Sequence, residues 1–419
     1  MHEQRIDAWL LYDFKLNNPV VARMLEAALV ASGSAKQGEA KPHLTRRIFW
    51  LIPAHGPARI LCHRIDDQDF VKAKLAHETY DGWRDLRPKV AELIQSSGGR
   101  RIAMEYSPGG ALPTAGIVDA GTIEFIRSLG AEVVSSADLM QLSAGVWGER
   151  GWASHQRAIA HCDRIMQEAF AFIRAKTQAT KGSAEVATHE REVQKFILDL
   201  FVKAGLVTDS DPIVGVNANA ADCHYSPDDQ RSKPIRRGDW VLIDLWAKEP
   251  GGGTVYGDIT WTGYCGALSG VSAKQRTVFD TVLAARDASI EAAQRGWAQS
   301  ANLKAHSSKA DGNSVIEGWQ LDEAARNVII GAGYEKFIKH RTGHSLSPGT
   351  PGAHGLGMNL DNIETHDTRR MLPGTGFTIE PGIYIDGDFG VRSEVNLYVD
   401  PAKGPIVTGT IQREIVAIV

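Results

Sequence analysis

Short apolar runs alternate with helical patterns along the first third of the chain. Each run is bounded by polar residues, glycine or proline, which predicts strands over 7–12, 47–52, 58–62 and 101–104. Apolar residues at helical spacing predict helices over 20–31, 70–76, 83–94 and 114–129. This alternation predicts a small α/β domain with a mixed sheet over residues 1–145.

The hydrophobic pattern changes after LSAGVWGERGW (142–152), a segment rich in glycine and small residues that we take as a domain boundary. Longer helices are predicted over 155–176, 188–204, 273–295 and 321–331. Strands are predicted over 240–247, 256–264, 376–385, 391–399 and 411–419. Residues 150–419 therefore read as a second domain of the α+β class.

Composition narrows the classes of function. A chain of 419 residues is too long for one ordinary core, in agreement with two domains. Lys and Arg number 46 against 50 Asp and Glu, so a basic surface for nucleic acid is not expected. No apolar run is long enough to span a membrane, and the N-terminus lacks a signal-peptide pattern. Four irregularly spaced cysteines suggest reduced thiols, and we expect a cytoplasmic protein.

Two acidic residues stand in apolar strands on either side of a glycine-rich turn. Asp244 lies in the middle of VLIDLWA, where an unpaired carboxylate would cost several kcal/mol. Asp258 follows fourteen residues later in DITWTGY. A hairpin closed at the midpoint, Gly251, would place the two carboxylates roughly opposite each other on one face.

The same spacing occurs again near the C-terminus. Glu380 in FTIEPGIY and Glu394 in VRSEVNLYV are also fourteen residues apart, with their midpoint at Gly387. Four carboxylates that converge in a core repel one another unless a cation lies between them. An oxygen-rich set of this size suits two divalent ions about 3.5–4 Å apart. A single buried acid could instead be hydrogen-bonded or paired with an arginine, but two matching pairs favour metal.

Histidines are concentrated close to these acids. His344 lies in HRTGHS after His340, and His354 lies between Ala353 and Gly355, where the backbone could approach a ligand. His224 in ADCHYSPDD precedes the first acidic strand. A lone histidine in a loop is most often solvated, so only their density makes these residues candidates for the site.

The order of these segments resembles a known family. HYSPDD, LIDLWAK, GDITWTG, HRTGHS, HGLGMNLDN, FTIEPGIY and GVRSEVNLYV follow the order of the pita-bread metallopeptidases, the group of methionine aminopeptidase, aminopeptidase P and prolidase. DAWLLYDFKLNNPVV resembles the N-terminal domain of the creatinase, aminopeptidase P and prolidase branch. The resemblance covers nearly the whole chain. It implies a C-terminal pita-bread fold preceded by a smaller creatinase-type α/β domain.

The resemblance implies five metal ligands: Asp244, Asp258, His344, Glu380 and Glu394. In this family Asp258 and Glu394 would bridge two ions, Asp244 would hold one ion, and His344 with Glu380 would hold the other. The family usually keeps its two aspartates closer together in sequence. Here the extra residues fall in the glycine-rich turn, so we expect no loss of metal. Manganese is the expected ion, with cobalt, zinc or iron as alternatives.

The resemblance also implies roles in catalysis. Two ions would lower the pKa of a water that bridges them and so provide hydroxide at neutral pH. Glu380 would accept the proton of this water and pass it to the leaving amine. His224 and His354 would hold the substrate carbonyl and stabilise the tetrahedral intermediate.

Two further residues are expected to bind substrate. His340 matches an additional pocket histidine of the family, and Arg392 matches an arginine close to the metals. Arg392 could orient Glu394, meet a substrate carboxylate, or form a purely structural salt bridge with Glu394. Trp246, adjacent to the first metal strand, is expected to pack in the core, with substrate stacking as the lesser alternative.

The expected function is hydrolysis of the bond between an N-terminal residue and a following proline, as in aminopeptidase P. A prolidase restricted to Xaa-Pro dipeptides is the main alternative. A metal-free creatinase-like amidinohydrolase and a non-catalytic binding module are disfavoured, because relatives of both kinds have lost the ligands that are intact here. The expected partners are a peptide with proline at its second position and, by resemblance, a second copy of the chain in a homodimer.

Overall fold

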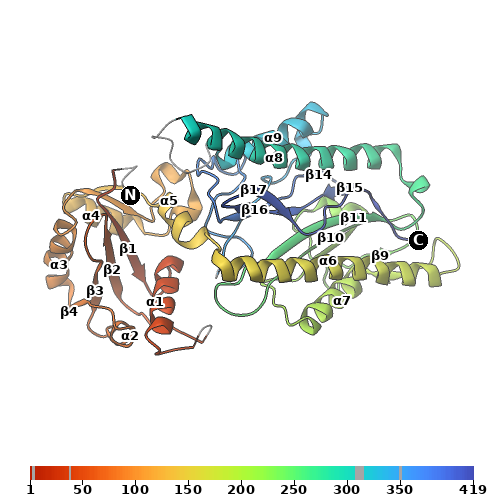
Figure 1. Ribbon diagram of the computed structural model, residues 1–419. Coiled ribbons are helices and arrows are strands. Elements are labelled where there is room, and N and C mark those ends of the chain that lie inside the picture. The colour runs from red at the N-terminus through yellow and green to blue at the C-terminus, as the bar shows by residue number, and fades with distance from the viewer. Residues whose placement is uncertain (2–4, 37–38, 307–315, 349–351) are drawn as a thin grey trace. The chain divides into compact units, whose positions relative to one another are not determined.

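The structure is a computed structural model that describes residues 1, 5–36, 39–306, 316–348 and 352–419. The chain divides into two compact units, Met1–Ala144 and Gly145–Val419. The division falls within the segment 142–152 that the sequence suggested as a boundary. Figure 1 shows the helices and strands of both units.

A six-stranded mixed sheet forms the centre of the N-terminal unit, in the order β4-β3-β2-β1-β5-β6. Its strands are β1 (Ala8–Phe14), β2 (Arg47–Pro53), β3 (Arg59–His63), β4 (Glu78–Tyr80), β5 (Arg101–Met104) and β6 (Glu132–Ser135). The helices are α1 (Pro19–Ala31), α2 (Gln68–Lys72), α3 (Trp83–Gln95), α4 (Ala120–Ser128) and α5 (Ala137–Met140). The four strands predicted here are confirmed, whereas β4 and β6 are too short to give a periodic signal.

The predicted helix over 114–129 is wrong in its first third. Residues Pro113–Ala115 form a single 3-10 turn, and α4 begins only at Ala120. Asp119 sets this start, because its carboxylate accepts hydrogen bonds from the backbone nitrogen (2.9 Å) and hydroxyl (2.7 Å) of Thr122. A side-chain cap of this kind satisfies amide groups that the first turn of a helix leaves free.

Long helices cover the sheets of the C-terminal unit. They are α6 (Gly148–Ala179), α7 (Glu190–Lys203), α8 (Ala273–His306) and α9 (Gly318–Gly331). Figure 1 shows α8 and α9 on one side of the strands and α6 and α7 on the other. Sequence periodicity predicted all of these helices, although α6 begins seven residues earlier than expected and α8 extends further.

Two four-stranded sheets carry the candidate site, in the orders β18-β11-β10-β8 and β12-β13-β16-β17. The pairs β14-β15 and β7-β9 form two small sheets. The strands are β7 (Thr188–His189), β8 (Ile213–Val216), β9 (Pro234–Ile235), β10 (Trp240–Ala247), β11 (Gly257–Tyr264), β12 (Ser345–Leu346), β13 (Gly376–Ile379), β14 (Gly382–Ile385), β15 (Phe389–Arg392), β16 (Val395–Asp400), β17 (Gly404–Thr408) and β18 (Val416–Ala417).

Three predicted strands differ from the structure. The run 376–385 is divided into β13 and β14, and the run 391–399 lies on β15 and β16, with the breaks at the two glutamates. Pro381 contributes to the first break because proline cannot donate to a sheet ladder. Of the predicted strand 411–419, only β18 forms, because the preceding residues bond to side chains and loops instead of a ladder.

Side-chain alternation on β10 explains how acids come to face a cavity. Val241, Ile243 and Leu245 are buried in a core that also contains residues of α6 and α7. Because successive strand residues point to opposite faces, Asp244 and Trp246 point to the other side of the sheet. One face of β10 therefore anchors the strand and the other contributes to the site.

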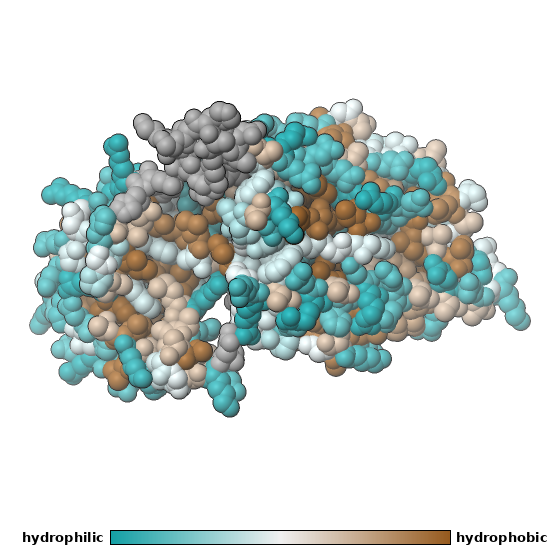
Figure 2. Space-filling view, viewed as in Figure 1, coloured by the Kyte–Doolittle hydropathy of each residue, from teal (hydrophilic) through white to brown (hydrophobic). Residues whose placement is uncertain are grey.

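None of the described helices combines the length and apolarity required to cross a bilayer. Hydrophilic residues cover much of the face shown in Figure 2, interrupted by hydrophobic patches. All four cysteines are free, as the sequence predicts.

Candidate metal centre

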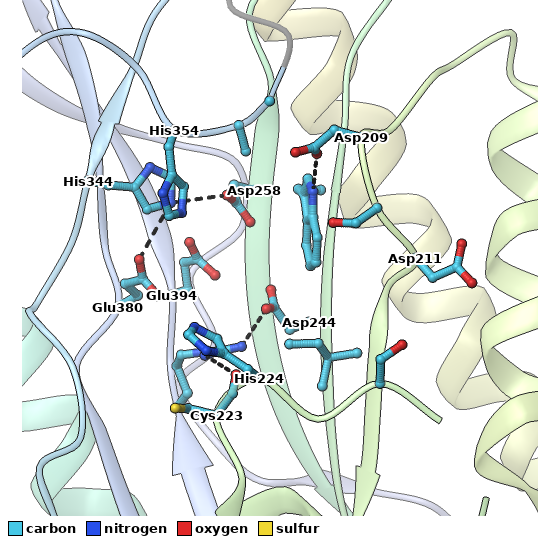
Figure 3. Close-up of a pocket in the computed structure, with 17 residues that line it drawn as sticks. Asp209, Asp211, Cys223, His224, Asp244, Asp258, His344, His354, Glu380 and Glu394 are labelled. Carbon is cyan, nitrogen blue, oxygen red and sulfur yellow. Dashed lines mark hydrogen bonds and ion pairs between the residues drawn. The ribbon is translucent and has the colours of Figure 1, made fainter. Parts of the chain in front are cut away.

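A cavity of about 590 Å³ opens in the C-terminal unit. Its walls include eight of the nine candidate residues: Asp244, Asp258, His344, Glu380, Glu394, His224, His354 and Arg392. Figure 3 shows the candidate acids and histidines among these residues converging on this space. Residues from positions 224 to 394 are thus brought together by the fold.

The first hairpin brings Asp244 and Asp258 to one face, although not directly opposite each other. Asp244 pairs with Thr260 and Asp258 pairs with Trp246, so the two acids are diagonal neighbours. The predicted midpoint at Gly251 is wrong by one residue. The turn contains positive φ angles at both Gly251 (100°) and Gly253 (76°), and it therefore closes around the residue between them. A shift of this size moves the pairing by two residues, which keeps both carboxylates on the same face.

The second hairpin has the register that the sequence predicted. Ile379 pairs with Val395 and Gly382 pairs with Arg392, and these pairs bracket the break. Glu380 therefore lies across from Glu394. The amide of Glu380 donates to Thr342 O (2.7 Å), and that of Glu394 donates to Thr260 O (3.2 Å). These bonds tie the glutamates to the HRTGH segment and to β11, the strand that carries Asp258.

His344 is held with one ring nitrogen free to bind a ligand. Its amide donates to Thr378 Oγ1 (2.9 Å), and its carbonyl accepts from the amide of Thr378 (2.9 Å). Nδ1 lies 3.1 Å from Ser345 O, which favours a proton on Nδ1 and a lone pair on Nε2. Nε2 lies 3.6 Å from both Asp258 Oδ2 and Glu380 Oε1 (Figure 3).

Three of the residues are close enough to share one ion. Potential ligand atoms of Asp258, His344 and Glu394 all lie within 4.8 Å of one another, and all three residues are buried. Asp244 has a different environment, because Arg392 forms an ion pair with its Oδ2. Its Oδ1 is buried without a hydrogen-bond partner among the described residues. A buried carboxylate oxygen in this state is costly unless a cation approaches it.

The position of Arg392 argues against one of its three alternatives, a salt bridge with Glu394. The guanidinium pairs with Asp244 instead, and its Nε donates to Thr260 Oγ1 (3.0 Å). The Thr260 hydroxyl in turn donates to Glu394 Oε2 (2.8 Å). Among the described residues, Thr260 therefore connects Arg392 to Glu394 by two hydrogen bonds. Thr260 is not among the residues predicted from the sequence, although its position two residues after Asp258 places it on the same strand face.

The electrostatics of the cluster favour a bound cation. Burial, followed by the charge of a neighbouring carboxylate, raises the pKa of both Asp258 and Glu394 well above the usual range. Burial also raises the pKa of Asp244, to about 7. At Glu380 burial acts in the same direction, but the nearby histidines, His344 first, outweigh it and lower the pKa. Carboxylates that hold protons in the absence of a cation, together with one imidazole, fit divalent metal.

Two further histidines line the cavity. The rings of His354 and His344 lie 4.0 Å apart between centroids. The charge of His344, with burial second, lowers the pKa of His354 to about 3, so His354 is neutral at pH 7. His224 is exposed in the loop before β10, where its amide donates to Asp222 Oδ1 (3.1 Å).

His340 does not line the cavity, in contrast to the other candidates. Its Nε2 lies 2.7 Å from the hydroxyl of Tyr384, and Nη1 of Arg392 donates to that hydroxyl at 3.4 Å. His340 therefore reaches the site through Tyr384. Trp246, expected in the core, is half-buried and lines the cavity, where its Nε1 donates to Asp209 Oδ1 (2.7 Å).

Comparison with known proteins identifies the family. The model of metallopeptidase family M24 matches residues 153–401. The chain belongs to this family. It is 29% identical over 213 residues to the Xaa-Pro dipeptidase of Pyrococcus horikoshii, which covers 49% of this chain and 48% of that protein. It is 30% identical over 200 residues to the Xaa-Pro dipeptidase of Lactobacillus helveticus, covering 46% and 44% of the two chains.

Solved structures are similar to this chain over nearly its whole length, and not only over the region matched in sequence. The X-Pro aminopeptidase of Thermotoga maritima MSB8 superposes with a TM-score of 0.56 at 20% identity and covers 99% of both chains. The M24 chain described here has the pita-bread α+β fold in its C-terminal unit. In sequence, the chain spans about half the length of the curated relatives that it matches.

Proposed function

We propose that this protein is a peptidase that requires two divalent metal ions and removes an N-terminal residue preceding proline, in the manner of aminopeptidase P. One observation carries the proposal. Four carboxylates and one imidazole converge on a single cavity, and one of the carboxylate oxygens is buried without a hydrogen-bond partner among the described residues. The names of M24 relatives that act on Xaa-Pro substrates support the choice of peptide.

In this proposal two of the five ligands would bind both ions, and the other three would each bind one ion. Asp258 and Glu394 would be shared by the two ions, Asp244 would hold one ion, and His344 with Glu380 would hold the other. When bound, divalent ions lower the pKa of water and polarise a carbonyl group, and together they stabilise negative charge in the transition state. Manganese is the ion that we expect, and the oxygen-rich ligand set also accepts cobalt, zinc or iron.

The protein's own side chains handle the proton and the substrate carbonyl. Glu380 accepts a proton from the attacking water and delivers it to the leaving nitrogen. Its Oε1 accepts a hydrogen bond from Thr378 Oγ1 (3.1 Å), which fixes the carboxylate. His354 and His224, which both face the cavity, hold the carbonyl oxygen as its negative charge grows.

Arg392 and His340 contribute to substrate binding in this proposal. Arg392 lines the cavity while its charge is largely balanced by Asp244, so its first effect is to orient that carboxylate. A substrate carboxylate could approach the same guanidinium. His340 would act through Tyr384, which connects it to Arg392.

A prolidase is the second candidate, because the two curated relatives described above are named Xaa-Pro dipeptidases. The two activities differ in the length of peptide that the cavity admits. We also propose a homodimer, which sedimentation of the purified chain would test.

Chelator-stripped protein supplied with Mn²⁺, Co²⁺ or Zn²⁺ distinguishes these activities. Each form is assayed on an Xaa-Pro dipeptide and on an Xaa-Pro tripeptide. Cleavage of the tripeptide that returns with metal supports the aminopeptidase, and cleavage of the dipeptide alone supports the prolidase. E380Q is the matched variant, because it retains the other four ligands but lacks the proton acceptor. Metal binding without cleavage of either peptide by the wild type would refute the Xaa-Pro assignment.

A further inference from the structure

The cavity of the candidate metal centre has two chemically different parts. Cys223, His224 and Arg392, whose Nη1 donates to Cys223 O (3.4 Å), line one part of the cavity, and Asp209 and Trp246, which are hydrogen-bonded to each other, line another. In Figure 3, Asp209 is at the upper right of the pocket and Cys223 is at the lower left. A peptide in the cavity would therefore meet a carboxylate in one part of it and a guanidinium in another.

Trp246 fixes the position of Asp209. Its Nε1 donates to Asp209 Oδ1 at 2.7 Å. Trp246 follows Asp244 by two residues on β10 and pairs with Asp258 on β11, so its side chain shares a face with the candidate ligands. The Asp209 carboxylate is thereby held beside the metal centre, even though it belongs to the loop after α7.

The Asp209 carboxylate remains accessible to a ligand. The residue is exposed, and it forms part of the cavity wall. A Cβ built on Gly352 would lie only 2.6 Å from Asp209 Oδ2, so a side chain at position 352 would crowd this oxygen. Glycine at position 352 therefore lets the backbone pass close to this carboxylate.

Asp211, the other acid in this wall, is less suited to bind a substrate cation. Its Oδ2 forms an ion pair with Arg191 Nη1 at 3.0 Å, which balances its charge. In Figure 3 its carboxylate points away from the cluster of Asp258 and His344. Asp209 is therefore the carboxylate that a peptide in this cavity would meet.

We propose that Asp209 and Trp246 select peptides whose first residue has a cationic side chain, namely Lys-Pro and Arg-Pro N-termini. The inference rests on the proposed Xaa-Pro activity and specifies its substrate. The side chains of lysine and arginine have an apolar stem and a charged tip. The indole of Trp246 can contact the stem, and the Asp209 carboxylate can pair with the tip.

Substrates matched in shape measure this preference. Lys-Pro-Ala is compared with norleucine-Pro-Ala, which has the same stem without the amine, or the corresponding dipeptides if the enzyme is a prolidase. The wild type with Mn²⁺ is expected to favour lysine about three- to tenfold in kcat/KM at low ionic strength, as suits a partly exposed ion pair. The ratio should fall towards one in D209N, whose amide oxygen can still accept from Trp246, and as salt is added. D211N, which removes the neighbouring charge, should keep the wild-type ratio.

The possible results of this experiment distinguish failure of the lysine preference from failure of the Xaa-Pro activity on which it depends. Cleavage of neither peptide by the metal-loaded wild type overturns the Xaa-Pro activity and with it the preference. Cleavage with the same lysine-to-norleucine ratio in wild type and D209N overturns the preference alone. An equal loss on both peptides in D209N also overturns it, because Asp209 would then bind the α-amino group that both substrates share.

Discussion

Each unit of the protein buries acidic side chains, but the two sites satisfy them differently. In the N-terminal unit, Glu105 is fully buried and accepts hydrogen bonds from Trp9 Nε1 (2.6 Å), Asn18 Nδ2 (2.7 Å) and Ser136 Oγ (3.0 Å). Both of its oxygens have partners. In the C-terminal unit, by contrast, several carboxylates share one cavity, and Asp244 Oδ1 has no hydrogen-bond partner among the described residues.

This difference in hydrogen bonding distinguishes Glu105, an acid with a structural role, from Asp244, a candidate metal ligand. Neutral donors can satisfy one buried carboxylate, and such a group then holds neighbouring segments together. Several carboxylates in one place cannot be satisfied in this way, because their mutual repulsion remains. Burial alone therefore does not mark a metal site, whereas burial together with like charge and an unsatisfied oxygen does.

The largest expected effect comes from removing a shared ligand. E394Q should lose the proposed Xaa-Pro hydrolysis by about a thousandfold or more, because in the proposed site both ions would share this carboxylate. In metal-free protein, E394Q should be about as stable as the wild type, because burial and the neighbouring carboxylates raise the pKa of Glu394, and a protonated glutamate is neutral like glutamine. Steady-state kinetics and urea unfolding measure the two effects. A stable E394Q with wild-type activity would show that Glu394 is not a ligand.

Glu105 should make the stability of the N-terminal unit depend on pH. Burial raises its pKa from 4.5 to about 7, although its three side-chain donors act in the opposite direction. As pH rises, the unfolded chain loses this proton before the folded chain does. The contribution of Glu105 to stability is therefore full below about pH 4.5 and falls by up to about 3 kcal/mol as pH passes 7. Urea unfolding at pH 5 and pH 8 should show this fall in wild type and a smaller one in E105Q.

E105Q should have the opposite effect to E394Q, because it should reduce stability and leave activity unchanged. At pH 5 the carboxyl group of Glu105 is protonated because burial raises its pKa to about 7, but its hydroxyl oxygen can still accept a hydrogen bond. The NH₂ group of a glutamine at position 105 cannot accept one, so one buried donor is left unsatisfied. We expect a loss of about 1–3 kcal/mol in the free energy of unfolding at pH 5, with no change in kcat/KM or in metal content. Parallel loss of metal from E105Q would remove the distinction between the two sites.

The smallest expected effect is that of substituting Thr260, which lies next to the acidic cluster. Thr260 connects Arg392 to Glu394 by two hydrogen bonds, and T260V keeps its shape without the hydroxyl. We expect kcat to fall about tenfold while metal remains bound, as is typical when a partner of a ligand is removed. T262V on the same strand is the control, since the Thr262 hydroxyl donates to the carbonyl of Arg392 and not to a ligand. Equal losses in the two variants would mean that Thr260 only stabilises the strand.

Local patterns predicted the elements that carry the site. The apolar run of β10 ends where the polar and glycine-rich segment KEPGGG begins, and its predicted bounds, 240–247, match the structure. The spacing of Glu380 and Glu394 around Gly387 also predicted their register, because a short hairpin is nearly symmetric about its turn. The turn between β10 and β11 is longer, and its two positive-φ glycines shifted the pairing in a way that spacing alone does not reveal.

Contacts between distant segments could not be predicted from local patterns. The ion pair of Arg392 with Asp244 joins residues 148 positions apart, and the bond of Trp246 to Asp209 depends on the path of the loop after α7. Glu105 gave no signal in the sequence, since its donors come from three separate segments. Such contacts depend on the packing of the whole unit, whereas strands and turns depend mainly on neighbours in sequence.

Calorimetric titration of chelator-stripped protein with Mn²⁺ tests the central claim most directly. The account predicts saturable binding of about two ions per chain in wild type and in E105Q, and loss of that binding in E394Q. Absence of saturable binding in the wild type, or equal binding in wild type and E394Q, would contradict the assignment of the acidic cluster as a metal centre.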